Sequence, residues 1–137
     1  MVLTQRPIIV GVVETWLNTS LNSSILGIPT YNVLRRDRKE KGGGLIVAVM
    51  DSIPQSIIFT SSTFEILSVE IILRDLKIRI IIGYVPNIID YQTVFGFFDE
   101  VSKLIPKTPF LIMGDFNLPA IDWSSLSFPQ NAIYSMY

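Results

Sequence analysis

The chain has 137 residues, a length typical of one compact domain rather than two. Hydrophobic residues make up 49% of it and charged residues 17%, which excludes an intrinsically disordered chain. Eleven basic and twelve acidic residues give a net charge of −1, so the chain as a whole does not attract nucleic acid, although a local basic patch remains compatible with this balance. No apolar run reaches the roughly 18 residues of a membrane-spanning helix, and we expect no secretory signal peptide.

The sequence contains neither cysteine nor histidine. This excludes disulfides, thiolate nucleophiles, cysteine-ligated metal centres, a Ser-His-Asp triad and any histidine general base. A metal bound by these side chains would therefore have to be a hard cation with oxygen ligands, such as Mg²⁺, Mn²⁺ or Ca²⁺.

The first half of the chain predicts short strands joined by polar loops. Residues 7–14 form a continuous apolar run that ends on Glu14, a pattern typical of a strand buried on both faces. After a loop, residues 31–36 predict a second strand. The segment 35–44 carries five basic residues and then three glycines, which predicts an exposed turn. Two further β-branched runs predict strands at 45–51 and 55–60.

The second half predicts a hairpin, a helix and a last strand. Residues 65–73 and 77–85 are β-branched runs around a turn at 74–76. Apolar residues then recur at helical spacing from Val94 to Ile105, with Asp90 as N-cap and Pro106 as the stop. A fully apolar strand is expected at 109–114, and a helix could begin at Gln130.

Several polar side chains follow the carboxyl ends of predicted strands, where sites collect in α/β proteins. They are Glu14, Tyr84, Asp115 and Asn117. A carboxylate in such a position is suited to bind a metal because the strand fixes its direction. Simpler interpretations stay open: Glu14 could cap a surface turn, Asp115 and Asn117 could form an Asx turn, and Tyr84 could pack on the core.

Taken together, six motifs resemble a known family. They are Glu14-Thr15-Trp16-Leu17, Arg35-Arg36-Asp37-Arg38, Gly42-Gly43-Gly44-Leu45-Ile46-Val47, Tyr84-Val85-Pro86-Asn87, Gly114-Asp115-Phe116-Asn117-Leu118-Pro119 and Ile121-Asp122-Trp123. In this order they resemble the endonuclease/exonuclease/phosphatase superfamily, and within it the apurinic-type endonuclease domain of non-LTR retrotransposons. The resemblance covers nearly the whole chain, 1–137, read as one partial domain.

The resemblance implies an α/β fold in which two β-sheets face each other with helices outside, a four-layer sandwich. It implies that Glu14 binds a divalent metal, Mg²⁺ or Mn²⁺, and that Asp115 orients or deprotonates the attacking water. Asn117 would position that water or the scissile phosphate, and Tyr84 would lie near the phosphate. These side chains suit metal-assisted phosphodiester hydrolysis.

The resemblance also implies partners. The substrate would be DNA, nicked inside the cell on nuclear DNA so that a reverse transcriptase in the same polyprotein can prime; no membrane partner is implied. Arg35, Arg36 and Asn87 are candidates for substrate contacts, whereas a solvated turn is the simpler interpretation of the basic run 35–41.

The sequence departs from the family pattern at both ends. Family members begin with a strand that bears a metal-binding Asn and end with an Asp and a Ser-Asp-His motif, and neither is found in these 137 residues. We therefore expect a domain truncated at both ends and inactive alone. The alternatives are a catalytically dead remnant with weak metal or nucleic-acid binding, or another phosphodiesterase or phosphatase branch of the superfamily.

Overall fold

The structure is a computed structural model that describes residues 6–38, 42–87, 90–118 and 124. Its elements, in chain order, are β1 (Ile9–Val13), the 3₁₀ helix η1 (Ser23–Leu26), β2 (Tyr31–Arg36), β3 (Leu45–Met50), β4 (Gln55–Thr60), β5 (Glu65–Leu73), β6 (Leu76–Tyr84), α2 (Tyr91–Leu104) and β7 (Phe110–Asp115). The motif Ile121-Asp122-Trp123, the residues 39–41 of the basic run and the helix expected from Gln130 lie outside the described residues.

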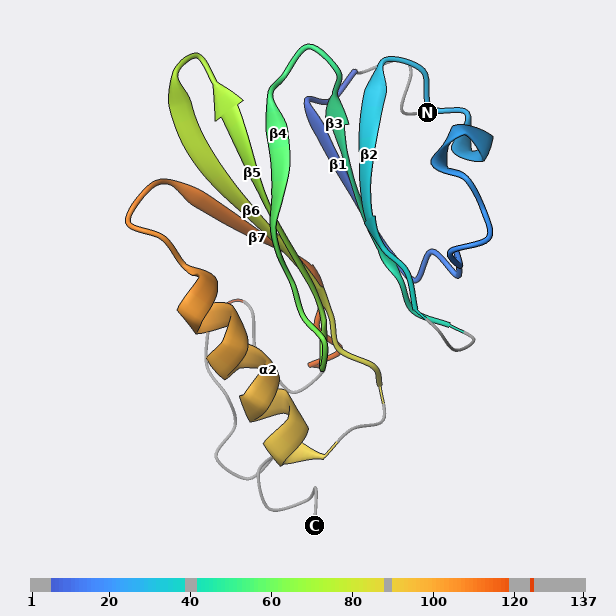
Figure 1. Ribbon diagram of the computed structural model, residues 1–137. Helices are drawn as coiled ribbons and strands as arrows, with labels where there is room; N and C mark the ends of the chain where they lie inside the picture. The colour runs from blue at the N-terminus through green and yellow to red at the C-terminus, as the bar shows by residue number, and fades with distance from the viewer. Residues whose placement is uncertain (1–5, 39–41, 88–89, 119–123, 125–137) are drawn as a thin grey trace.

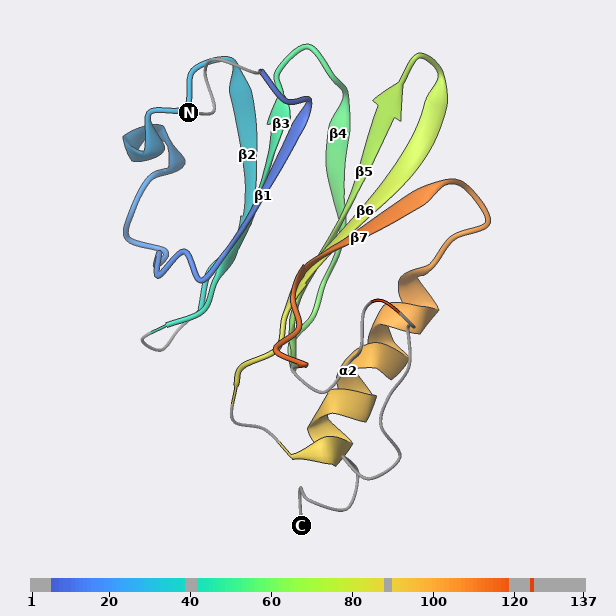
Figure 2. The same cartoon turned by 180° about the vertical axis from the view of Figure 1, so that it is seen from behind.

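The strands form two sheets that face each other (Figure 1). One has three antiparallel strands in the order β1-β3-β2. The other has four strands in the order β4-β5-β6-β7, in which only the β6–β7 pair is parallel. Helix α2 makes the crossover between these two parallel strands and lies on the outer face of their sheet. Seen from behind, β1 and β7 lie on the same side of the sandwich (Figure 2).

The core has two parts because β5 and β6 are buried on both faces. The larger part fills the space between the sheets with alternate residues of β3, β5 and β6, such as Val47, Val69 and Ile82. The smaller part joins the other face of these strands to the helix, where Ile81 packs near Phe97. Successive residues of β6 face the two parts of the core in turn, so the residues on both faces at its end are apolar.

The predicted fold class is confirmed: two facing sheets with a helix outside. Strands 31–36, 55–60 and 65–73 have the predicted bounds. Within the described residues α2 is the one α-helix, so the three-stranded sheet has no α-helix on its outer face. Because no described α-helix covers that face, β1 is not buried on both faces. The expectation for 7–14 is therefore wrong, and Val12 is 41% exposed.

The hairpin turn is tighter than predicted. Leu76 belongs to β6 and pairs with Leu73, so the turn consists of Arg74 and Asp75 alone, both with positive φ. Two residues with positive φ form the turn whose twist matches that of the flanking strands. The predicted N-cap of the helix is confirmed: the Asp90 carboxylate accepts a hydrogen bond of 2.9 Å from the Thr93 amide.

No helix within the described residues is long and apolar enough to cross a membrane.

Candidate active site at one end of the sandwich

Three of the predicted site residues meet at one end of the sandwich. Glu14 follows β1, Tyr84 is the last residue of β6 and Asp115 is the last residue of β7. The Tyr84 hydroxyl donates a hydrogen bond to Oε1 of Glu14, which joins the two sheets. Tyr84 and Asp115 are partners in the register of the parallel pair β6–β7. The structure therefore brings side chains from three strands together.

The meeting point differs from the expectation in one respect. The position of both Glu14 and Asp115 after predicted strands suggests one shared sheet edge, but β1 and β7 belong to different sheets. Both carboxylates nevertheless lie near Tyr84, because β1 and β7 lie on the same side of the sandwich and their ends point the same way. The site thus lies between the two sheets.

Tyr84 is the buried member of this group, with 8% of its surface exposed, whereas Glu14 and Asp115 are exposed. The hydrogen bond to Glu14, reinforced by burial and by the charges of Glu14, Asp115 and Glu65, raises the pKa of Tyr84 to about 12. The phenol is therefore a firmly neutral hydrogen-bond donor at neutral pH.

Asp115 and Asn117 form the turn that follows β7. The Asn117 amide donates to Oδ1 of Asp115 at 3.1 Å, which is the Asx turn that the simpler interpretation expected. The Asn117 side chain also donates from Nδ2 to the carbonyl of Val85 at 2.6 Å, and the Val85 amide donates to the Asp115 carbonyl at 2.9 Å. This turn is locked against the end of β6. Asp115, Asn117 and Asn87 are among the residues that line a cavity of about 540 Å³.

The two candidate arginines point in opposite directions because they are neighbours in β2. Arg35 pairs with Asp37 and donates to the carbonyls of Asn18 and Leu21, in the loop after β1. Arg36 instead points toward the four-stranded sheet. Of these two arginines, Arg36 alone lines a cavity that Tyr84 also lines.

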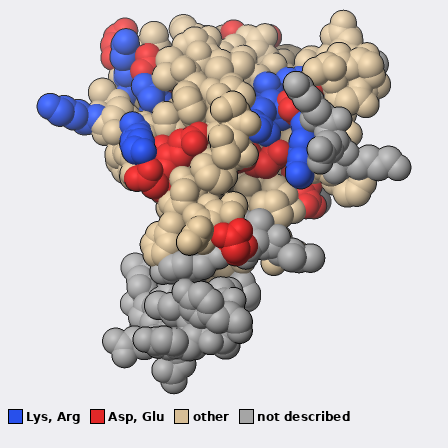
Figure 3. Space-filling model, turned by 60° about the horizontal axis from the view of Figure 1, so that its bottom comes forward, with Lys and Arg blue, Asp and Glu red and all other residues tan. Residues whose placement is uncertain are grey.

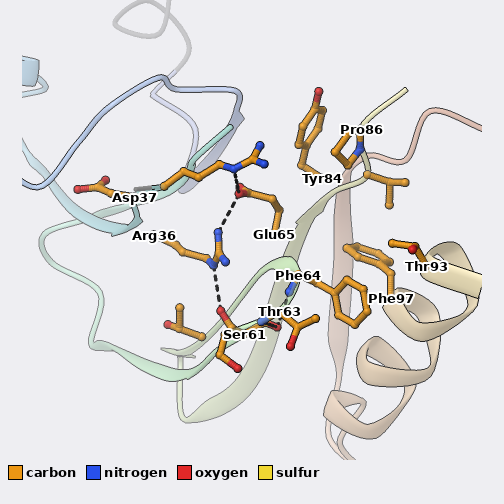
Figure 4. A pocket seen from close by; sticks show the side chains of 14 residues that line it. Arg36, Asp37, Ser61, Thr63, Phe64, Glu65, Tyr84, Pro86, Thr93 and Phe97 are labelled. Carbon is orange, nitrogen blue, oxygen red and sulfur yellow. Dashed lines mark hydrogen bonds and ion pairs between the residues drawn. The ribbon is translucent and has the colours of Figure 1, made fainter. Parts of the chain in front are cut away.

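That second cavity, of about 640 Å³, lies between the end of β2 and the start of β5 (Figure 4). Its lining combines Arg36, Arg38, the hydroxyls of Ser61 and Thr63, and the rings of Phe64 and Phe97. At the end of the sandwich seen in Figure 3, Lys and Arg side chains lie next to Asp and Glu side chains. Some of these basic and acidic side chains form ion pairs with each other, as Arg36 does with Glu65.

Glu65 is a residue of this region that the sequence did not single out. It begins β5, it is 8% exposed, and its carboxylate lies 2.9 Å from Arg36 Nη1. It is also the cross-strand partner of Tyr84. The sequence shows Glu65 only as a single acidic residue at the start of an apolar strand. That pattern is too common to identify a functional site.

The oxygen atoms at this end of the sandwich are of the kind that a hard cation binds, but the described residues offer too few of them to complete its ligand set. Carboxylate and amide oxygens are the ligands that Mg²⁺ takes. Within the described residues, however, no group of three or more Asp and Glu side chains is placed to hold a metal. Glu14 also already accepts the Tyr84 hydroxyl. The described residues therefore do not make a metal site by themselves.

The two facing sheets and the polar strand ends between them define an α/β sandwich with a candidate site at one end. A crystal structure of D. rerio TDP2 complexed with single-strand DNA product has a similar fold, with a TM-score of 0.62 and 14% sequence identity. The match covers 95% of this chain and 56% of that chain, so this chain spans little more than half the length of that protein.

At this identity the likeness shows the shared fold. TDP2 is itself a member of the endonuclease/exonuclease/phosphatase superfamily, whose fold the sequence motifs led us to expect. No protein-family model matches the chain, and no curated protein matches it either.

Proposed function

We propose that this chain is part of a metal-dependent DNA phosphodiesterase, of the endonuclease type found in retrotransposon polyproteins. One observation carries the proposal: Glu14 of one sheet is hydrogen-bonded to Tyr84 of the other, beside Asp115. The motifs that contain these residues resemble the superfamily to which TDP2 belongs, and TDP2 has been crystallised with single-strand DNA product.

The family resemblance suggests a role for each side chain, and the chemistry of each side chain suits that role. Asp115 accepts the proton of a water whose oxygen bonds to phosphorus, while the bond from phosphorus to the leaving oxygen breaks and that oxygen takes up a proton. Asn117 holds the turn that carries Asp115, and Tyr84 donates a hydrogen bond at the place where negative charge develops.

A divalent cation, Mg²⁺ or Mn²⁺, would polarise a phosphoryl oxygen. In this chain Glu14 would be one of its ligands, and the described residues do not complete the set. We therefore propose that the parent polypeptide supplies further ligands, and that Arg36 and Asn87 face the DNA backbone. Arg35 is a weaker candidate because it contacts the loop after β1 and does not line the cavity that Arg36 shares with Tyr84.

The proposal is tested in the longest polypeptide encoded around this sequence, in a nicking assay on supercoiled plasmid with Mg²⁺. We expect nicking that is lost in Glu14→Ala and in Asp115→Asn and retained in Glu70→Gln, a β5 variant remote from the site. The 137-residue chain alone is expected to leave the plasmid intact. Nicking that survives Glu14→Ala would overturn the proposed site.

A second candidate is a non-hydrolytic remnant that binds metal or nucleic acid weakly. The incomplete set of acidic ligands among the described residues favours it. It predicts that the longer polypeptide lacks the Asn strand and the Ser-Asp-His motif and leaves plasmid intact under all conditions.

A further inference from the structure

Glu65 is a nearly buried carboxylate that holds three groups from the other sheet and its loops. Its Oε1 lies 2.9 Å from Arg36 Nη1 and 3.7 Å from Arg38 Nε, and its Oε2 accepts the Gly44 amide at 2.9 Å. Figure 4 shows the Glu65 carboxylate directed toward Arg36, away from the helix. Such a charge is expensive to bury unless it is paired; here Oε1 lies in ion-pair range of the two arginines and Oε2 accepts a hydrogen bond.

The Gly44 contact continues toward the site. The carbonyl of Gly44 accepts the amide of Thr15 at 3.3 Å, and the carbonyl of Gly43 accepts the amide of Trp16 at 2.9 Å. Thr15 and Trp16 directly follow Glu14. Residues 42–44 are three consecutive glycines, called here the glycine turn. A path of hydrogen bonds thus runs from β5 of one sheet, through the glycine turn, to the segment that follows Glu14 at the end of the other sheet.

This segment needs to be held. Glu14 and Trp16 have positive φ angles of 52° and 55°, a conformation that costs a non-glycine residue free energy and persists only when its surroundings enforce it. Gly44 approaches so closely that a Cβ there would lie 2.5 Å from the Thr15 Oγ1, and its own φ is +93°. The glycine turn is therefore the surface against which the segment after Glu14 is fixed.

We propose that Glu65 is the positioning residue for Glu14: it anchors the glycine turn, and the turn fixes the backbone that aims the Glu14 carboxylate at Tyr84. The functional meaning of this role rests on the proposed function of Glu14, but the geometric role does not. Glu65 acts through backbone contacts and touches no reacting group, so it is not itself catalytic.

The test uses amide hydrogen exchange and NOE measurements on the soluble monomer of the 137-residue chain, in which every variant also carries Leu111→Lys to oppose association through the exposed edge of β7. In Glu65→Ala we expect protection of the Gly44, Thr15 and Trp16 amides to fall about tenfold or more, the effect of losing one hydrogen bond to a charged acceptor. The NOE between the side chains of Glu14 and Tyr84 should weaken, while core amides such as Ile81 keep their protection.

Two matched variants separate positioning from general stability. Glu65→Gln keeps an oxygen that can accept the Gly44 amide, so protection of Thr15 and Trp16 should return most of the way. Glu70→Ala removes another β5 carboxylate that pairs with two basic residues, Lys77 and Arg79, and should leave these amides unchanged.

The proposal is overturned if Thr15 and Trp16 keep their protection in Glu65→Ala, if Gln and Ala cause equal losses, or if Glu70→Ala has the same effect. Should Glu65→Ala fail to fold because Arg36 is left unpaired, Arg36→Met together with Glu65→Leu removes both charges, and the same selective loss is expected. Because no readout involves metal, DNA or activity, these outcomes are independent of whether the proposed phosphodiesterase function holds.

Discussion

The hydrogen bond from Tyr84 to Glu14 is the contact on which the candidate site depends at the residue scale. Replacing Glu14 by Ala removes the largest cause of the raised phenol pKa, so the pKa of Tyr84 should fall from about 12 toward its ordinary value of 10. Ultraviolet titration of tyrosinate measures it, with Tyr84→Phe to identify the signal among five tyrosines. Asp99→Ala, in the remote helix, is the control and should change nothing; an unchanged titration in Glu14→Ala would show that the contact is not formed.

The same contact makes stability depend on pH in the alkaline range. Since the folded state raises the pKa of Tyr84, it binds the phenol proton more tightly than the unfolded state does. The resulting stabilisation is fully present below pH 10 and is lost as the pH rises to about 12. It amounts to roughly 2 to 3 kcal/mol at most, and comparison of urea unfolding for wild type and Tyr84→Phe across this range should reveal it. Parallel pH profiles would contradict the prediction.

Divalent cations should bind weakly, because Glu14 is an exposed carboxylate with few acidic neighbours. In a Mn²⁺ titration followed by NMR, we expect line broadening to begin at Glu14 and Tyr84, with a midpoint on the order of millimolar or above. Glu14→Ala should abolish it, whereas Asp99→Ala should leave it intact. Broadening centred on Asp99 and Glu100 in α2 would contradict the assigned site.

At the scale of elements, the join between α2 and β6 decides how precisely Tyr84 is placed. Gly83 lies directly under the helix, and a Cβ there would lie 2.5 Å from the ring of Phe97. Gly83→Ala should therefore destabilise the protein by about 1 to 3 kcal/mol through overpacking, measured by chemical denaturation.

Shortening the opposing side chain provides the control for this prediction. In Gly83→Ala combined with Phe97→Leu, the added methyl group has room, so the double variant should be more stable than the sum of the two single effects. Strict additivity would mean that the cost of the alanine does not come from the ring of Phe97.

At the scale of the whole molecule, exposed apolar strand edges favour self-association. Within the described residues β7 pairs with β6 on one side only, and its Phe110 and Leu111 are 46% and 47% exposed. Such an edge invites pairing with another chain, so we expect the isolated chain to be found mainly as aggregate.

Leu111→Lys should increase the soluble monomer several-fold in size-exclusion chromatography, because a charge on an edge strand opposes edge-to-edge pairing. Ile72→Lys adds the same charge at another exposed apolar position, but on β5, whose two edges are both paired. It should help less. An equal gain from both variants would show that net charge, rather than the β7 edge, controls association.

Local patterns in the sequence predicted most of the elements, and the family resemblance of its motifs predicted the two facing sheets. Apolar and β-branched runs predict strands, and Asp90 with the 94–105 spacing predicts the helix, because these patterns are local consequences of backbone geometry. They also placed Glu14, Tyr84 and Asp115 at strand ends, as the structure has them. The pattern could not tell that β1 and β7 lie in different sheets, since sheet membership depends on long-range pairing.

Tertiary structure alone decided how the candidate site is held. Strand alternation predicts that Arg35 and Arg36 face opposite ways, but only the packing of β2 against the other sheet decides that Arg36 is the one that faces Glu65. The positive φ of Glu14 is likewise enforced by the glycine turn, whose residues lie about thirty positions further along the chain. A local pattern reports what each residue prefers; the partners that override this preference are brought together only by the folded chain.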